Sequence, residues 1–369
     1  MSGDLLATLL AFLQVFRPAL TEPGYRNMLV VFAGWVRTSG LHAMTEALVV
    51  TGVSGRRHHE AFHRFFSRGT WSPDELARLL FVCVLRLLPD GSPILAAVDD
   101  TLAPKSGPHV FGIGNHLDPV RSTQRVRIFC FGHCWVVLAI IVPLPFSQRT
   151  WALPLLFRLH RSKKECAAHD AIYRKKTELV RGMLDVLGGW VGDRQVRLTA
   201  DSAYCNATVT RGLADNFRLY GAMRPDAVLS APPPERTRTS GRPRIRGERL
   251  PTPEALAKDP RIPWIGYHVM LRGRFQVVRS KTLCAQWYRA CGVRLLRIVV
   301  VRIDEGAIGL RVFFSMNPDA AVEEVLEGYA ERWGIETCSR NLKQLLGFAD
   351  SCARKAQAVA RIAPFVGLI

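Results

Sequence analysis

The sequence predicts an α/β protein in which a helical N-terminal region precedes a sheet and a second strand-rich segment precedes a final helix. Three observations support this prediction. Apolar residues recur at helical spacing along most of residues 1–90. From residue 93 on, short runs rich in Val, Ile and aromatic residues alternate with turns, and residues 320–346 return to a helical pattern. With 369 residues, 48% of them hydrophobic, the chain is long enough for two or three domains.

Basic residues outnumber acidic ones. The chain has 50 Lys and Arg against 31 Asp and Glu, a formal net charge of +19 and an isoelectric point near 10.1. Such an excess indicates a polyanionic partner, first of all nucleic acid. Ribosomal and membrane-surface proteins usually concentrate their charge in Lys-rich tails or amphipathic stripes, whereas Arg is spread along this whole sequence. We therefore expect nucleic acid, and no membrane, as the partner.

The cysteines and the apolar runs argue against other classes. No C-x-x-C pair occurs, and the closest pair, Cys130 and Cys134, flanks His133 in an apolar run. This indicates reduced, buried thiols and a packed histidine rather than zinc. No secretory signal is present, so we expect a cytoplasmic protein that is associated with the nucleoid when bound to DNA. Residues 135–146, the most apolar segment, are too short to span a bilayer and predict a buried strand.

Residues 1–90 are predicted to be a helical, DNA-binding region. Within it, residues 54–71 carry several cations around three phenylalanines. The cations that we expect to contact DNA phosphates are Arg56, Arg57 and Arg64. An ordinary amphipathic helix with a solvated basic face explains the same segment equally well.

The next part of the chain predicts the start of a sheet. The expected elements are three strands, a helix and a strand, at residues 94–98, 125–131, 135–142, 165–188 and 195–200. Their order is β-β-β-α-β, which is typical of an α/β core.

A second strand-rich segment begins with a basic stretch. Residues 231–251 are rich in Pro and predict an exposed, mobile loop. Its arginines are Arg236, Arg238, Arg242, Arg244, Arg246 and Arg249. Strands are predicted near residues 219–223, 264–270, 274–279, 294–303 and 309–315.

Three carboxylates stand where chemistry is usually found. Asp99 and Asp201 each follow a predicted strand, and Glu336 lies on the final predicted helix. Strand ends meet at one edge of a sheet, where sites commonly form. Oxygen ligands suit Mg²⁺, and two such ions can assist the attacking and the leaving oxygen in a displacement at phosphorus. For either aspartate alone, capping of the next turn is the better explanation.

The final predicted helix has a polar face and an apolar face. Helical spacing places Tyr329, Arg332, Glu336 and Lys343 on the polar side. The opposite side, expected to pack on the core, carries Ile335, Leu342, Leu345 and Leu346. Without the two aspartates, an ordinary charged surface helix fits this pattern at least as well.

The spacing Tyr329-x2-Arg332-x3-Glu336-x6-Lys343 resembles the Y-R-E-K signature of bacterial insertion-sequence DDE transposases, a group of DDE superfamily endonucleases. Residues 98–101 (Val-Asp-Asp-Thr) and 199–204 (Thr-Ala-Asp-Ser-Ala-Tyr) resemble the two acidic motifs of that family. The resemblance extends from about residue 50 to the end of the sequence. It implies a metal-dependent endonuclease that cleaves strands at transposon ends and transfers them into target DNA, assembled as a homodimer on the DNA.

The resemblance also implies roles for single residues. Asp99, Asp201 and Glu336 would be the catalytic carboxylates and hold Mg²⁺, with Mn²⁺ as a substitute. Two cations, Arg332 and Lys343, would bind phosphates near the cleaved strand, and Tyr329 would position the transposon end. The first motif of the family has Thr or Ser two positions after the ligand, which selects Asp99. Its neighbour Asp100 remains a rival, and on a strand only one of the two can face the metal.

The fold implied by the resemblance is an RNase H-like core interrupted by a mainly β insertion before the catalytic Glu helix. The 135 positions from Asp201 to Glu336 leave room for it. We expect an N-terminal helical DNA-binding region at 1–90, the first part of the core at 91–225, the insertion with its basic loop at 226–307, and the second part of the core at 308–369.

The sequence ends in an apolar run, residues 363–369, which we expect to pack into something that follows it. This indicates a C-terminally truncated product. Two alternatives therefore remain: an inactive or truncated transposase that acts as a DNA-binding repressor, and an RNase H-like nuclease that does not transpose.

Overall fold

The computed structural model describes residues 2–107, 109–147, 149–235, 242–271, 273–302 and 309–369. The strands of the first part are β1 (Ile94–Pro104), β2 (Gly114–Leu117), β3 (Phe129–Val142), β4 (Trp151–His160), β5 (Val196–Ala200) and β6 (Phe217–Met223). Those of the second part are β7 (Leu229–Ser230), β8 (Arg249–Leu250), β9 (Ile265–Leu271), β10 (Arg274–Gln286), β11 (Leu295–Arg302) and β12 (Arg311–Ser315).

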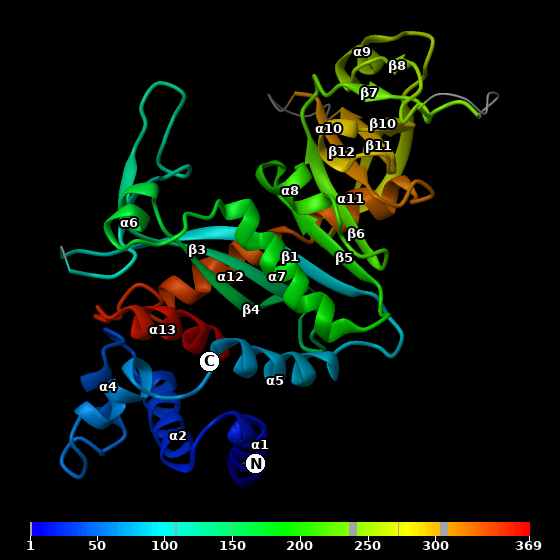
Figure 1. Ribbon diagram of the computed structural model, residues 1–369. Helices are drawn as coiled ribbons and strands as arrows, with labels where there is room; N and C mark the ends of the chain where they lie inside the picture. The colour runs from blue at the N-terminus through cyan, green and yellow to red at the C-terminus, as the bar shows by residue number, and fades with distance from the viewer. Residues whose placement is uncertain (1, 108, 148, 236–241, 272, 303–308) are drawn as a thin grey trace.

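These strands form one large mixed sheet (Figure 1). Its order is β2-β3-β1-β5-β6-β12-β11-β10-β7-β8, with β4 also paired to β3 and β9 to β10. Pairing is parallel between β1 and β5 and between β5 and β6, and antiparallel elsewhere. The prediction of an α/β protein is confirmed by this mixed sheet and the helices around it.

Two of the predicted strands differ from the observed ones. The strands expected at 125–131 and 135–142 are parts of one long strand, β3. The third long strand of the core is β4, which the sequence analysis missed because Pro154 and Arg158 interrupt its apolar run. The β-β-β-α-β order therefore holds for β1, β3, β4, the following helix and β5. Its second and third strands are not the ones that were predicted.

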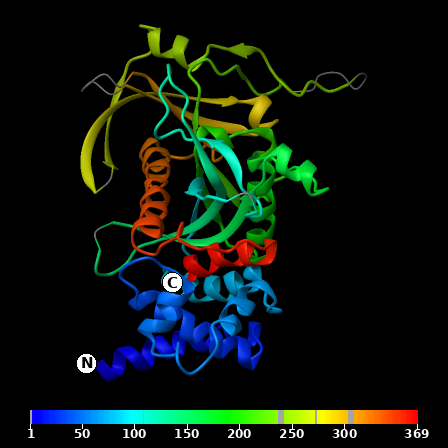
Figure 2. The same cartoon turned by 90° about the vertical axis from the view of Figure 1, so that its left-hand side faces the viewer.

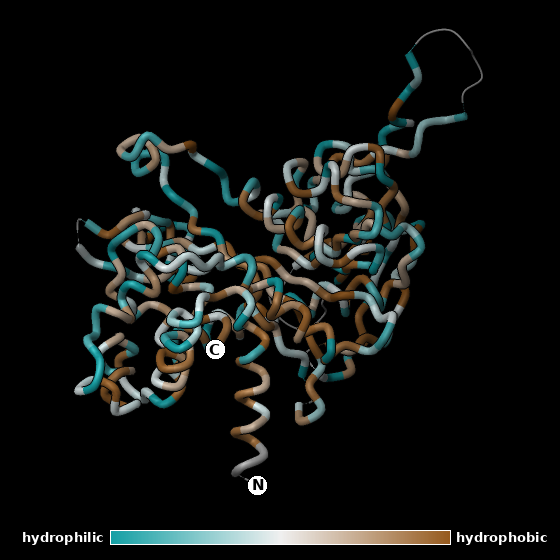
Figure 3. The backbone as a smooth tube through the Cα atoms, turned by 60° about the horizontal axis from the view of Figure 1, so that its bottom comes forward, coloured by the Kyte–Doolittle hydropathy of each residue, from teal (hydrophilic) through white to brown (hydrophobic). Residues whose placement is uncertain are grey.

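The N-terminal helices form a lobe below the sheet in Figure 1. They are α1 (Ser2–Gln14), α2 (Glu22–Arg37), α3 (Met44–Val50), α4 (Glu60–Ser67) and α5 (Pro73–Leu85), with a short 3-10 turn at Arg17–Ala19. Buried aromatic side chains fill the lobe, among them Trp35, Phe62, Phe65 and Phe66. The helix α1 projects from the body, and apolar residues lie along its length (Figure 3).

The remaining helices lie between and beside the strands. They are α6 (Lys163–Ala168), α7 (Lys176–Val191), the 3-10 turn η2 (Ser202–Tyr204), α8 (Ala207–Thr210), α9 (Pro253–Lys258), α10 (Tyr288–Cys291), α11 (Val322–Ala330), α12 (Trp333–Gln344) and α13 (Ala356–Leu368). Figure 2 shows α13 between the helical lobe and the sheet, where it contacts β4 on one side and α4 and α5 on the other. None of the helices in the described ranges is long and apolar enough to cross a membrane.

The two faces of the sheet belong to different cores. Ala96 and Val98 of β1 pack into the core that α7 covers, whereas Ala97 packs into the core shared with α12, α13 and the helical lobe. This alternation follows from the two-residue period of a strand. The position of a polar residue along β1 therefore determines whether its side chain faces α7 or α12.

Three expectations for the C-terminal part are corrected. The single helix expected over 320–346 is two helices that meet at Glu331 and Arg332, where backbone bonds shift to the i→i−3 pattern. Leu345 does not pack on the core, since its side chain is 65% exposed. The apolar run 363–369 packs within this chain, where Phe365 and Val366 are buried against β4 and α4.

Part of the basic stretch lies within the described residues. Arg249 lies in β8, which pairs with β7, and the Arg246 guanidinium lies 4.7 Å from the centre of the Tyr288 ring. Arg236 and Arg238 lie outside the described residues, as does the predicted boundary at residue 307.

Candidate active site

The first two predicted carboxylates follow the same parallel ladder. Pairing of β1 with β5 ends at Val98 and Ala200, so Asp99 and Asp201 are the next residues of two neighbouring strands. The prediction that Asp99 ends its strand is wrong, because β1 continues along β3 to Pro104. Asp201 leaves the sheet, and its carboxylate accepts a hydrogen bond from the Ser202 amide at 2.6 Å, which caps η2.

Asp99 and Asp100 point to opposite faces of the sheet. The Asp99 carboxylate faces α12, with Oδ2 3.5 Å from Nη1 of Arg332. The Asp100 carboxylate faces α7 and accepts hydrogen bonds from Nζ of Lys176 and from the hydroxyl of Tyr204, both at 2.6 Å. Asp99 thus lies on the same side of the sheet as Glu336. Asp100 lies on the opposite side, where Lys176 and Tyr204 both donate hydrogen bonds to it.

Their surroundings shift the two carboxyl groups in opposite directions. Burial, together with the nearby Asp100 and Glu336 carboxylates, raises the pKa of Asp99 to about 6 against the lowering effect of Arg332. Burial acts on Asp100 too, but the Lys176 ammonium and the hydrogen bonds from Lys176 and Tyr204 outweigh it and lower the pKa of Asp100. A carboxylate such as Asp99, desolvated among other acids, is one that a bound cation would stabilise.

The third carboxylate is held by the signature arginine. Nη2 of Arg332 donates to Oε1 of Glu336 at 2.6 Å, across one turn of helix. The same guanidinium contacts Asp99 and lies 5.7 Å from the centre of the Tyr329 ring, and its side chain is only 15% exposed. Tyr329 in turn lies near Asp201, whose charge contributes to the raised pKa of the Tyr329 phenol, although burial is the main cause. Arg332 thus sits among the groups that the signature predicted.

The donor set fits a hard divalent cation in its chemistry. Asp99, Asp201 and Glu336 offer only carboxylate oxygens, the ligands that Mg²⁺ and Mn²⁺ prefer. Within the described ranges, however, these three carboxylates do not lie within 4.8 Å of one another. The cation found among them is the Arg332 guanidinium, which bridges Asp99 and Glu336.

The other predicted DNA contacts form no ion pair with these carboxylates among the described residues. Lys343 is exposed in the last turn of α12. Arg56 and Arg57 are exposed before α4, in the helical lobe (Figure 1). Nε of Arg64 lies 3.1 Å from Oε1 of Glu60 in an exposed ion pair. The sequence analysis missed Lys176, whose pairing with Asp100 depends on how α7 docks on the sheet.

Comparisons with known proteins place the chain in a family. The family model described as DDE superfamily endonuclease matches residues 16–278, which include Asp99 and Asp201 and end before α12. No protein of curated function matches the chain. Among solved structures, the chain is similar to piggyBac transposase in its synaptic complex with hairpin DNA, at 11% sequence identity and a TM-score of 0.42. That match covers 95% of this chain and 66% of the other, so the chain spans about two thirds of the length of that transposase. Because the family model matches well over half of its residues, this chain belongs to the DDE superfamily endonucleases.

Proposed function

We propose that this chain is a DNA transposase that cleaves strands at the ends of its element and joins them to target DNA. The observation that carries the proposal is that Asp99 and Glu336 both contact Arg332, with Asp201 following the neighbouring parallel strand, in a chain of this family. DDE superfamily endonucleases are enzymes that act on DNA and use divalent metal ions. We assign Mg²⁺, with Mn²⁺ as substitute, to the three carboxylates.

The strand order supports an RNase H-like core. In the order β4-β3-β1-β5-β6, the first three strands are antiparallel and β5 and β6 continue parallel to β1. The elements β7 to β11 lie in the chain between β6 and β12, in the stretch that we propose as the insertion. We retain the division at 90/91, 225/226 and 307/308 as part of this proposal.

The protein groups of the site have separable tasks. When bound, the metal would activate the attacking oxygen and offset charge on the leaving oxygen. The Asp201 carboxylate, fixed by the Ser202 amide, and the Asp99 carboxylate, fixed by the Asp100 amide at 2.8 Å, are held as ligands in set orientations. The Arg332 guanidinium offsets the repulsion between the Asp99 and Glu336 carboxylates in the free enzyme, and on release from Glu336 it is placed to contact a phosphate.

The proposal is tested by incubating the purified chain and Mn²⁺ or Mg²⁺ with labelled DNA that carries the two flanks of its own gene. We expect cuts at defined positions in both flanks and joined products when target DNA is added. Binding without cuts, equal to that of an Asp201→Ala control, would support the repressor alternative. Cuts without joined products would support a nuclease that does not transpose.

Lys343 is predicted to contribute to DNA affinity rather than to the fold. Because its side chain is exposed at the end of α12, Lys343→Ala should leave the thermal unfolding temperature unchanged. Loss of one phosphate contact should reduce the slope of log K against log salt by about one. Fluorescence anisotropy at several salt concentrations measures this slope. Lys258→Ala is a matched control, since Lys258 is exposed and already paired with Glu254, and it should bind like the wild type.

Arg56 and Arg57 are predicted to bind DNA more strongly than Arg64. The first two are exposed and form no ion pair among the described residues, whereas the charge of Arg64 is partly neutralised by its ion pair with Glu60. Arg56→Ala and Arg57→Ala should each weaken binding to any sequence and lower the salt slope by about one, with a smaller effect for Arg64→Ala. Equal and unchanged affinities for all three variants would show that this basic face is merely solvated.

A further inference from the structure

A second cluster of metal-ligand side chains lies on the α7 face of the sheet. One ligand atom from each of His116, Cys134 and His160 lies within 4.8 Å of the other two. The residues come from β2, β3 and β4, and strand pairing places them on one face of the sheet. His160 is directly opposite Cys134, and His116 is opposite Cys130, which shares a face with Cys134 at a separation of four residues.

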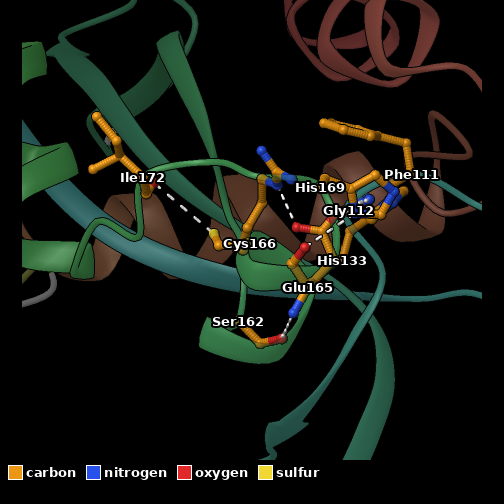
Figure 4. Close-up of polar contacts among 9 residues, drawn as sticks. Phe111, Gly112, His133, Ser162, Glu165, Cys166, His169 and Ile172 are labelled. Carbon is orange, nitrogen blue, oxygen red and sulfur yellow. Dashed lines mark hydrogen bonds and ion pairs between the residues drawn. The ribbon is translucent and has the colours of Figure 1, made fainter.

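The face of this cluster is not that of the candidate active site. Cys134 pairs with Leu102 of β1, two residues beyond Asp100, so it shares the face of Asp100 and not that of Asp99. The Cys134 sulfur lies 3.6 Å from Oδ2 of Asp100. His133, the neighbour of Cys134, points elsewhere and forms a 2.9 Å hydrogen bond with the Phe111 carbonyl (Figure 4).

Two nitrogen atoms in the cluster have no hydrogen-bond partner among the described residues. Nε2 of His116 and Nδ1 of His160 are both buried, and neither forms a hydrogen bond to any described residue. His116 is only 8% exposed and Cys134 is fully buried. Leaving a buried polar atom without a partner is destabilising, so two such atoms beside one thiol need a physical explanation.

Burial and a nearby cation act on both histidines. Burial and the Lys176 ammonium lower the pKa of His116, and the same causes lower that of His160 to about 4. The Lys176 charge is itself compensated by Asp100 at 2.6 Å. Burial and the adjacent Asp100 carboxylate raise the pKa of the Cys134 thiol, which a bound metal would have to deprotonate.

We propose that His116, Cys134 and His160 form a zinc site. Two imidazole nitrogens and one thiolate match the borderline-soft character of Zn²⁺ and differ in kind from the all-oxygen set at Asp99, Asp201 and Glu336. Ligand atoms around one tetrahedral zinc lie roughly 3–4 Å apart, so small side-chain movements close the site. A water molecule would complete the coordination.

The site would fasten β2 to the core. The short strand β2 pairs with β3 over four residues only, and its preceding loop is held by the Gly112 amide, which donates to Glu165 of α6 at 3.2 Å (Figure 4). A zinc ion would add a direct link from β2 to β3 and to β4, next to α6. Because binding would occur only in the folded chain, it would raise the stability of this part of the molecule.

The test uses the wild-type chain after removal of metal, titrated with Co²⁺ and then with Zn²⁺. We expect about one Co²⁺ per chain to give tetrahedral ligand-field bands and a thiolate-to-cobalt charge-transfer band, both lost when Zn²⁺ displaces it. The carboxylate site lacks sulfur, so Co²⁺ bound there gives no such band, and Asp201→Asn should leave the band unchanged. Absence of the charge-transfer band from the wild type would overturn the proposal without bearing on the transposase function.

Matched variants assign the ligands. Cys134→Ser should abolish the band, whereas Cys130→Ser, the same change four residues away on β3, should keep it. His160→Gln should weaken Zn²⁺ binding at least about tenfold. His169→Gln, which changes an exposed histidine at the end of α6, should not. A band that persists in Cys134→Ser, or disappears equally in Cys130→Ser, would contradict the assignment.

Discussion

Asp99→Asn and Asp201→Asn are each expected to lower the rate of metal-dependent strand cleavage by at least about a thousandfold. Both changes remove a charge that a divalent ion would need and keep the shape of the side chain. They also keep the local hydrogen bonds, because an amide oxygen can still accept from the Asp100 amide or from the Ser202 amide. Cleavage of labelled DNA ends, with circular dichroism as a measure of folding, checks the prediction.

Asp100→Asn separates the two rivals for the first ligand. This change leaves Lys176, which is partly buried, without its counter-ion, and it should cost stability of about 1–3 kcal/mol. Because Asp100 faces α7, cleavage by the folded fraction should persist. The opposite result, activity in Asp99→Asn and none in folded Asp100→Asn, would transfer the catalytic role to Asp100.

Asp99→Asn should also change the pH dependence of stability in the metal-free protein. The folded pKa of Asp99, about 6, exceeds the ordinary value of 3.8, so the folded state binds this proton more tightly than the unfolded state does. Its contribution is fully present below about pH 4 and is lost as the pH rises through 6. The variant should therefore gain stability relative to the wild type between pH 4 and 6.5. Thermal unfolding in EDTA across this range measures the difference, and parallel curves would contradict it.

Arg361→Ala is expected to reduce the free energy of unfolding by about 3–5 kcal/mol. Arg361 lies on α13, is 6% exposed, and donates to the carbonyls of Phe66 at 3.1 Å and Trp71 at 2.6 Å. Its guanidinium also lies 4.8 Å from the centre of the Trp71 ring. Truncation leaves two buried carbonyls without donors and opens a space between α13 and the helical lobe.

Denaturant unfolding of the Arg361 variant provides the measurement. The control is Arg354→Ala, at an exposed arginine just before α13, which should change the stability by less than about 0.5 kcal/mol. If both variants unfold alike, the contact between α13 and the lobe contributes little. An intact fold in which only the lobe is released would instead appear as a separate, earlier transition.

Local patterns predicted those parts of the site that depend on short stretches of chain. Asp99 and Asp201 come next to each other because each follows an apolar run, and parallel strands bring such ends together. The common face of Tyr329, Arg332 and Glu336 survives the break between α11 and α12, because Glu331 and Arg332 keep right-handed helical dihedral angles. The predicted packing of Leu345 was wrong, because α12 ends at Gln344 and Leu345 is its exposed C-cap residue.

Features set by strand pairing could not be predicted in this way. β4 carries a proline and an arginine and is recognised as a strand only through its pairing with β3. Likewise, His116 and His160 are 44 positions apart in the sequence, and the pairing of β2 and β4 with β3 is what places them on one face with Cys134. The proposed zinc ligands therefore could not be recognised from the sequence, in which Cys134 stands near only Cys130 and His133.

The position of β12 has a consequence for how this protein can be cut and recombined. β12 pairs with β6 of the core on one side and with β11 on the other, and it leads directly into α11. The β7–β11 stretch therefore cannot be removed without exposing a strand of the core sheet. Removing this stretch would leave β12 as an unprotected edge of the sheet. β12 is the strand that leads into the helices with Tyr329 and Glu336. Shortened or chimeric versions should stay soluble only when β11 and β12 are exchanged together.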